Sequence, residues 1–139
     1  MTKKTFKSIA AVLAGFIIVV ILSVGTDFVL ESLHIFPPQS EPLSYTSLML
    51  MYALIYRLIY TVVGGYVTAR LAPDRPGLHA VILGIVGIVA GTIGMSVAWD
   101  LSPHHWYPIA LVVTALPCTW LGGRLKTIQK MKFNSARPA

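Results

Sequence analysis

The sequence predicts an all-α fold, a bundle of four transmembrane helices with both termini cytoplasmic. Three observations predict it. The 139-residue chain is 55% hydrophobic and only 12% charged, with a mean hydropathy of +0.73, which leaves too few polar residues to cover a water-soluble domain. Four apolar runs are long enough to cross a ~30 Å hydrocarbon core, which takes about 20 helical residues. All but one of the basic residues are confined to the termini and one loop.

The four predicted helices form one transmembrane domain over residues 1–125 and cover about 6–33, 45–71, 78–99 and 106–125. The apolar runs are continuous and do not alternate with period two, so helices rather than barrel strands satisfy the backbone in lipid. Proline-containing segments separate the runs: "FPPQSEP", "APDRPG" and "DLSPHHWYP". Proline ends helices because its ring removes a donor and clashes with the preceding turn. Residues 126–139 are expected to form a basic cytoplasmic tail.

The charge distribution predicts the orientation. The formal net charge is +6, and lysines and arginines precede the first run, lie between the second and third, and follow the fourth, whereas the other two loops contain none. This is the positive-inside pattern, so we expect a multi-pass protein with its N- and C-termini inside. The pattern accounts for the basic charge without a nucleic acid. The expected partner is the lipid bilayer, and nucleic-acid binding is not expected.

The first apolar run and the single cysteine exclude two other classes. The run is longer than the roughly 7–15-residue core of a signal peptide, so we expect it to be retained as a helix. Cys118 is the only cysteine, so the chain has neither an internal disulfide nor a C-x-x-C motif. That excludes the four-helix thiol oxidases, which need cysteine pairs.

Small residues recur along one face of the third predicted helix at spacings of three and four. They are Ala80, Gly84, Gly87, Gly91, Gly94 and Ala98. Membrane helices associate through close backbone contact, which small residues permit. The stripe therefore predicts a helix-packing surface. The sequence does not decide whether the helix that packs on this surface belongs to the same chain or to a second copy in a homo-oligomer.

One arginine, Arg57, lies inside the second predicted helix. A charge near the centre of a membrane helix costs about 2.5–3.5 kcal/mol on insertion scales, so such residues face the bundle interior and find a partner. Asp27 is the nearest acid by depth, and Tyr56 and Tyr60 are local alternatives. Asp27 and Arg57 are thus predicted to form an intramembrane polar pair. The pair is either a structural ion pair that fixes the first helix against the second, or an anion-binding or proton-linked group in a cavity that opens outward.

A set of acidic and histidine residues is expected on the outer face: Glu31, His34, Asp100, His104 and His105. On a helix, the spacing of Asp27, Glu31 and His34 places all three on one face. Glu31 and His34 also have the E-x-x-H spacing of di-iron bundles, but those sites draw further carboxylates from other helices. We therefore predict no metal site and no cofactor, and interpret Glu31 and His34 as polar residues at the membrane edge.

Four segments carry a resemblance to known sequences: "DFVL…FPP", "YRLIYTVVGGYVTARLAP", "RPGLHAVILG" and "HWYPIALVVTALPCTWLGG". They resemble a group of small uncharacterised bacterial four-helix integral membrane proteins. The resemblance implies a shared set of residues: Asp27, Arg57, Gly64, Gly65, Arg70, Pro73, His79, His105, Trp106, Tyr107 and Pro108. It implies a four-helix fold in the bacterial inner membrane and supplies no activity.

The residues favour a non-catalytic inner-membrane protein, a small binding or accessory module. One alternative is a subunit of a small-solute or ion transporter, with Asp27 and Arg57 lining the pathway. Another is a membrane metal-binding protein or enzyme that uses Asp100, His104 and His105. A hydrated cavity around Arg57 would favour transport, and a metal at the outer loops would favour the last alternative.

Overall fold

The structure, a computed structural model, describes residues 2–38, 40–101 and 103–136, except for the side chain of Pro42. Four long helices contain most of them: α1 (Lys3–Ser32), α2 (Ser47–Leu71), α3 (Pro76–Ala98) and α4 (Trp106–Ala136). Two short 3-10 helices, η1 (Pro42–Ser44) and η2 (Trp99–Leu101), precede α2 and follow α3. The all-α, four-helix prediction is confirmed. Each long helix has the length and apolar composition needed to cross a membrane.

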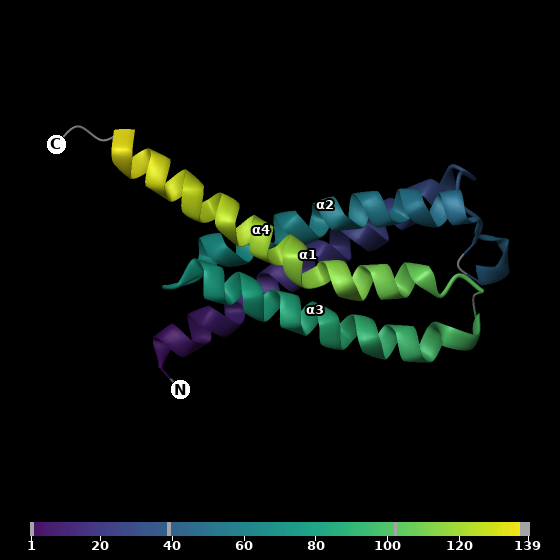
Figure 1. The fold of residues 1–139 in the computed structure, drawn as a ribbon, viewed down its shortest axis with the longest axis horizontal. Helices are drawn as coiled ribbons and strands as arrows, with labels where there is room; N and C mark the ends of the chain where they lie inside the picture. Colours follow the sequence, from purple (N-terminus) through teal and green to yellow (C-terminus); the bar gives the residue numbers. More distant parts are fainter. Residues whose placement is uncertain (1, 39, 102, 137–139) are drawn as a thin grey trace.

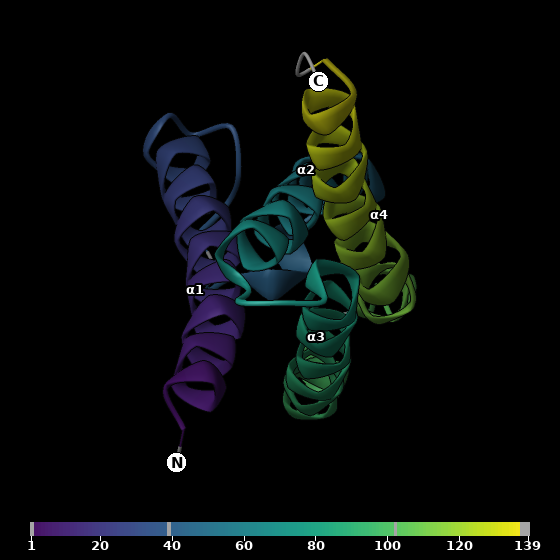
Figure 2. The same cartoon turned by 90° about the vertical axis from the view of Figure 1, so that its left-hand side faces the viewer.

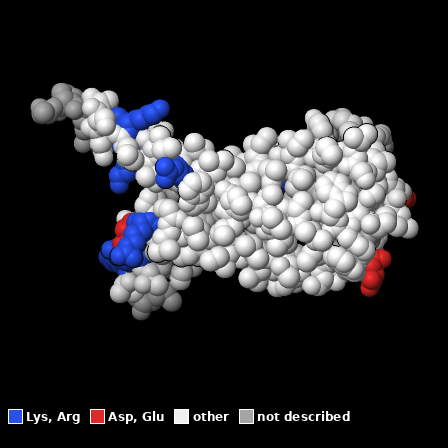
Figure 3. Space-filling model, viewed as in Figure 1, with Lys and Arg blue, Asp and Glu red and all other residues white. Residues whose placement is uncertain are grey.

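The bundle has two chemically different ends. The start of α1, the end of α4 and the α2–α3 connection lie at one end, here the termini end. Residues 33–38, 40–46, 99–101 and 103–105 form the other, the loop end (Figure 1). Lysines and arginines gather at the termini end, whereas acidic side chains are visible at the loop end (Figure 3). The termini end also holds Asp74, which pairs with Lys4 at 2.6 Å. The Lys4 ammonium holds the pKa of the Asp74 carboxyl below its usual range.

Helix α4 continues well beyond the predicted end near residue 125, and reaches Ala136. The segment after Leu125 contains three lysines, one glutamine and one methionine, and neither glycine nor proline before Ala136, so nothing in it opposes a helix. The Tyr66 hydroxyl donates to the side chain of Gln129 and holds the extension against α2. The predicted tail is thus helical as far as Ala136, and residues 137–139 lie outside the described part.

Helix α1 ends at Ser32, so His34 does not share a helix face with Asp27 and Glu31 as its spacing suggested. His34 has a φ of 58°, the left-handed conformation that often ends helices. The next two backbone N–H groups, of Ile35 and Phe36, both return to the carbonyl of Leu30, at 2.9 and 3.2 Å. This turn directs Phe36 back into the interior, where only 5% of it is exposed.

The termini half of the bundle is closed by glycine contacts between α2 and α4. A Cβ added to Gly65 would lie 2.8 Å from Thr119 Cα, and one added to Gly122 would lie 2.6 Å from the backbone nitrogen of Tyr66. No real side chain fits at such distances, so the two backbones are in direct contact. Thr68 is fully buried and donates to the carbonyl of Ala11 at 3.1 Å, which ties α1 to the same interface.

The small-residue stripe of α3 divides into two parts. Ala80 is fully buried, and a Cβ on Gly84 would lie 3.0 Å from Leu116 Cα, so this part of α3 packs on α4 of the same chain. A Cβ on Gly91 would still meet Val112, at 3.0 Å, whereas one on Gly94 would meet nothing within 4 Å. Ala98 is exposed as well. The stripe is therefore a helix interface near the termini end and an uncovered surface near the loop end.

The helices separate toward the loop end. Seen along the bundle, α2 lies between α1 and the α3–α4 pair (Figure 2). Helices α1 and α3 come close where Gly15 faces Leu83, and they diverge from there toward the loop end (Figures 1 and 2). Their divergence leaves room in the loop half for a cavity.

Candidate functional site: a cavity at the loop end

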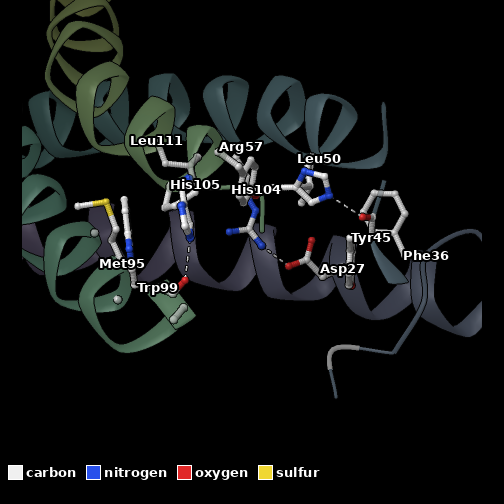
Figure 4. A pocket seen from close by; sticks show the side chains of 16 residues that line it. Asp27, Phe36, Tyr45, Leu50, Arg57, Met95, Trp99, His104, His105 and Leu111 are labelled. Atoms are coloured by element: carbon white, nitrogen blue, oxygen red, sulfur yellow. Dashed lines mark hydrogen bonds and ion pairs between the residues drawn. The ribbon is translucent and has the colours of Figure 1, made fainter. Parts of the chain in front are cut away.

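A cavity of about 440 Å³ opens in the loop half of the bundle. We call it the loop-end cavity. Its walls come from all four helices and from both loops, and are mostly apolar. They comprise Asp27, Phe36, Tyr45, Leu50, Ala53, Arg57, Gly91, Gly94, Met95, Ala98, Trp99, His104, His105, Tyr107, Pro108 and Leu111. Figure 4 shows these side chains converging on the space around Arg57.

A buried carboxylate bound by two donors forms one side of the cavity. Asp27 of α1 is 6% exposed. One of its oxygens accepts from the Tyr56 hydroxyl and the other from Nη2 of Arg57. Tyr56 and Arg57 are consecutive residues of α2, so their side chains leave the helix about 100° apart and meet the carboxylate from two directions. A charged group in a low-dielectric interior is tolerated when it is paired and hydrogen-bonded in this way.

The guanidinium of Arg57 also faces α4. Its central carbon lies 5.9 Å from the centroid of the Tyr107 ring, within the range of a cation–π contact. Its Nε is buried and has no hydrogen-bond partner in the described part of the chain. Arg57 is therefore bound to Asp27 through Nη2 only.

Two histidines close the cavity toward the loop end, each tied to a backbone carbonyl. Nε2 of His104 lies 2.9 Å from the carbonyl of Tyr45, and Nε2 of His105 lies 2.9 Å from that of Trp99 (Figure 4). The His105 ring also stacks on the Trp99 indole, with centroids 4.0 Å apart. These contacts connect the α3–α4 loop to the α1–α2 loop through Tyr45 and to η2 through Trp99.

Tyr45 and Phe36 build the wall on the side of the α1–α2 loop. Their rings meet edge to face, with centroids 5.7 Å apart, and the Tyr45 hydroxyl donates to the carbonyl of Pro37 at 3.0 Å. Burial raises the pKa of the Tyr45 phenol, and the carboxylates of Asp27 and Glu31 raise this pKa further. Tyr45 therefore stays a neutral hydrogen-bond donor.

The structure separates the residues predicted for the outer face. His104 and His105 line the cavity, while His34 and Asp100 are exposed and Glu31 is half-buried outside it. Within the described ranges, no three His, Cys, Asp or Glu side chains lie close enough together to hold a metal ion. The expected outer-face cluster is therefore two cavity residues and three separate polar residues.

Several cavity residues carry no signal for a cavity in hydropathy or residue spacing. Phe36, Trp99 and Tyr107 lie at the ends of apolar runs, where aromatic residues are common at any membrane interface. Gly94 and Ala98 belong to the stripe predicted for packing. Of the residues that the resemblance implies, five line the cavity: Asp27, Arg57, His105, Tyr107 and Pro108. The adjacency of these groups depends on the packing of helices far apart in sequence.

The fold and the cavity define the class of this protein: an all-α chain with four helices suited to crossing a membrane and a partly polar cavity between them. Comparison with protein-family models, curated proteins and solved structures found no match to this chain.

Proposed function

We propose that this chain is a non-catalytic, multi-pass inner-membrane protein that binds a small ligand in the loop-end cavity, with both termini on the cytoplasmic side. The observation that carries the proposal is the cavity of about 440 Å³ that reaches the Asp27–Arg57 pair. Ligand sites are concave, largely apolar and supplied with a few convergent polar groups. This cavity has that composition.

The closed termini half favours binding over transport. Gly65 and Gly122 bring α2 and α4 into backbone contact beyond the cavity, and Thr68 is fully buried there. A ligand in the cavity thus has access from the loop half only. A transporter subunit remains the second candidate because both members of the charged pair line the cavity, and it requires a conformation in which the glycine contacts separate.

The proposed orientation predicts the result of cysteine labelling in intact cells. Cys118 is first replaced by serine, and single cysteines are then introduced at Leu43, which is 76% exposed at the loop end, and at Ser135 near the end of α4. An impermeant thiol reagent is expected to label Leu43→Cys and not Ser135→Cys, because the lysine-rich end stays inside. Labelling of Ser135→Cys alone would reverse the topology.

Access to the cavity is tested with two neighbouring positions of α3. Gly94 lines the cavity, whereas Ile93 is 61% exposed on the outer surface of the same helix. In the Cys118→Ser background, a small polar methanethiosulfonate is expected to modify Gly94→Cys faster than Ile93→Cys, because the reactive thiolate forms in water and not in hydrocarbon. Equal rates would argue against an accessible cavity.

The same assay separates binding from transport. Thr68→Cys lies in the closed half, where the native side chain is fully buried. Protection of this cysteine under all conditions favours a one-sided binding cavity. Modification of Thr68→Cys from the termini side would instead favour the transporter.

A further inference from the structure

The loop-end cavity contains hydrogen-bond donors that have no acceptor among the described residues. Arg57 donates to Asp27 through Nη2 only. Its Nε has no partner among these residues either, but it is buried, so the other terminal nitrogen is the one that can reach a bound molecule. In Figure 4 its other terminal nitrogen points away from Asp27. The Tyr107 hydroxyl, on the opposite wall of the cavity, has no hydrogen bond to another described residue. Both side chains can therefore donate to a bound molecule.

The Asp27 carboxylate and the backbone carbonyls of Tyr45 and Trp99 already have hydrogen-bond partners within the protein. Each oxygen of Asp27 accepts one hydrogen bond, from Tyr56 or from Arg57. The carbonyls of Tyr45 and Trp99 lie against His104 and His105. Because Asp27 balances the charge of Arg57, the polar side of the cavity is close to neutral and offers donors. A ligand head with an oxygen acceptor can pair with the guanidinium of Arg57, whereas an ammonium head would be repelled by its positive charge.

The rest of the wall suits an apolar body. Leu50, Ala53, Met95 and Leu111 present aliphatic or thioether surface, and Trp99 adds an aromatic face. Helices α1 and α3 diverge at this level (Figure 2), and the large apolar side chains on their outer surfaces are exposed, including Phe28 at 70% and Ile93 at 61%. The cavity thus lies between two helices whose outer surfaces are suited to lipid.

We propose that the loop-end cavity binds a membrane-soluble amphiphile that places a carbonyl or carboxylate oxygen on Arg57 and Tyr107 and its apolar body against Trp99 and Met95. This proposal rests on the proposed binding function and adds the class of ligand. The acceptor oxygen of the ligand receives hydrogen bonds from the other terminal nitrogen of Arg57 and from the Tyr107 hydroxyl, which otherwise lack an acceptor among the described residues. The apolar body of the ligand exchanges contacts with lipid for contacts with the cavity wall.

The test uses four probes that share one body and differ in the head. They are 4-bromobenzoate, 4-bromoacetophenone, 4-bromobenzylammonium and bromobenzene. The full chain in detergent carries Trp106→Phe and Trp120→Phe, which leaves Trp99 as the only tryptophan, and contact with bromine quenches its fluorescence. At least one of the two oxygen-bearing probes is expected to quench at a concentration about tenfold lower than the ammonium and headless probes, as for a hydrogen bond to a charged donor.

The two oxygen-bearing probes also identify the kind of head. Quenching by the carboxylate alone assigns an anionic amphiphile, and quenching by the ketone alone assigns a neutral one. Equal quenching by all four probes, stronger quenching by the ammonium probe, or no quenching by any probe would each overturn the proposal.

Three variants separate recognition from simple partition into micelles. Tyr107→Phe keeps the ring beside Arg57 and removes only the hydroxyl, so the oxygen-bearing probes are expected to bind about three- to tenfold more weakly, as for the loss of one hydrogen bond. Gly94→Phe introduces a ring at a cavity-lining position where an added Cβ meets nothing within 4 Å, and is expected to abolish the preference for the oxygen-bearing probes. Its control is Gly25→Phe, where an added Cβ likewise meets nothing within 4 Å. Gly25 lies outside the cavity wall, so this variant is expected to retain the preference.

The failures of the two proposals are distinguishable. If Gly94→Cys reacts faster than Ile93→Cys but the probes show no preference for an oxygen head, the cavity is accessible and only the ligand class is wrong. If Gly94→Cys reacts no faster than Ile93→Cys, the proposed binding function itself fails.

Discussion

Replacing Arg57 with methionine is expected to lower the stability of the bundle by about 3 kcal/mol, because it leaves a buried carboxylate without its counter-charge. Asp27 is 6% exposed and would keep only the Tyr56 hydroxyl as a donor. Asp27→Asn is expected to cost less, since the Arg57 side chain is 29% exposed and can turn toward the cavity. Melting temperatures of the detergent-solubilised proteins measure both effects.

The double variant decides whether the two residues act as a pair. Arg57→Met combined with Asp27→Asn removes both charges and is expected to recover much of the loss, with a coupling energy of roughly 1–3 kcal/mol. Methionine fits the mostly apolar wall, and the introduced asparagine can still accept a hydrogen bond from Tyr56. Strictly additive losses would show that the ion pair does not contribute to stability.

Gly122→Ala is expected to disrupt the packing of α4 on α2. The added Cβ would lie 2.6 Å from the backbone nitrogen of Tyr66 and 3.0 Å from the carbonyl carbon of Gly65. These are backbone atoms of a helix, so the clash can be relieved only by separating the two helices. Overpacking of this kind typically costs about 1–3 kcal/mol, and more where neighbours cannot move. Thermal unfolding and the fraction of monodisperse protein in size-exclusion chromatography measure the effect.

The matched control for Gly122 is Gly25→Ala in α1. A Cβ at Gly25 meets nothing within 4 Å, so this variant is expected to keep the stability of the parent protein or to raise it slightly through helix propensity. If both alanine variants melt at the same temperature as the parent, the close contact between α2 and α4 is absent from the folded protein.

The sequence by itself determined the fold class and the number of helices. Hydropathy and the position of proline are local properties of the chain, and in a bilayer each apolar run must satisfy its own backbone as a helix. The same reasoning singled out Arg57, because a charge within such a run needs a partner. The sequence also pointed to Asp27 as that partner by depth alone, and the structure places the two side chains in contact.

Helix ends were less predictable because they depend on individual residues. A lysine-rich segment suggested a tail after Leu125, yet its residues favour helix and α4 continues to Ala136. The spacing of Glu31 and His34 suggested one helix face, yet His34 takes a left-handed conformation just after α1. The conformation of His34 depends on where the Phe36 side chain must pack, and that position is set by α2.

Only the tertiary structure decided that a cavity exists and which residues form it. Gly91 and Gly94 look alike in the sequence and both line the cavity, yet a Cβ on Gly91 would meet Val112 of α4 and one on Gly94 would meet nothing within 4 Å. Tyr107 and Trp99 look like ordinary interfacial aromatics and instead lie around Arg57 and His105. In a membrane protein, the surfaces that face lipid, another helix or an apolar cavity have similar compositions, because lipid and protein interior are equally apolar. Periodicity therefore shows which residues share a helix face, and only the positions of the neighbouring helices show what that face meets.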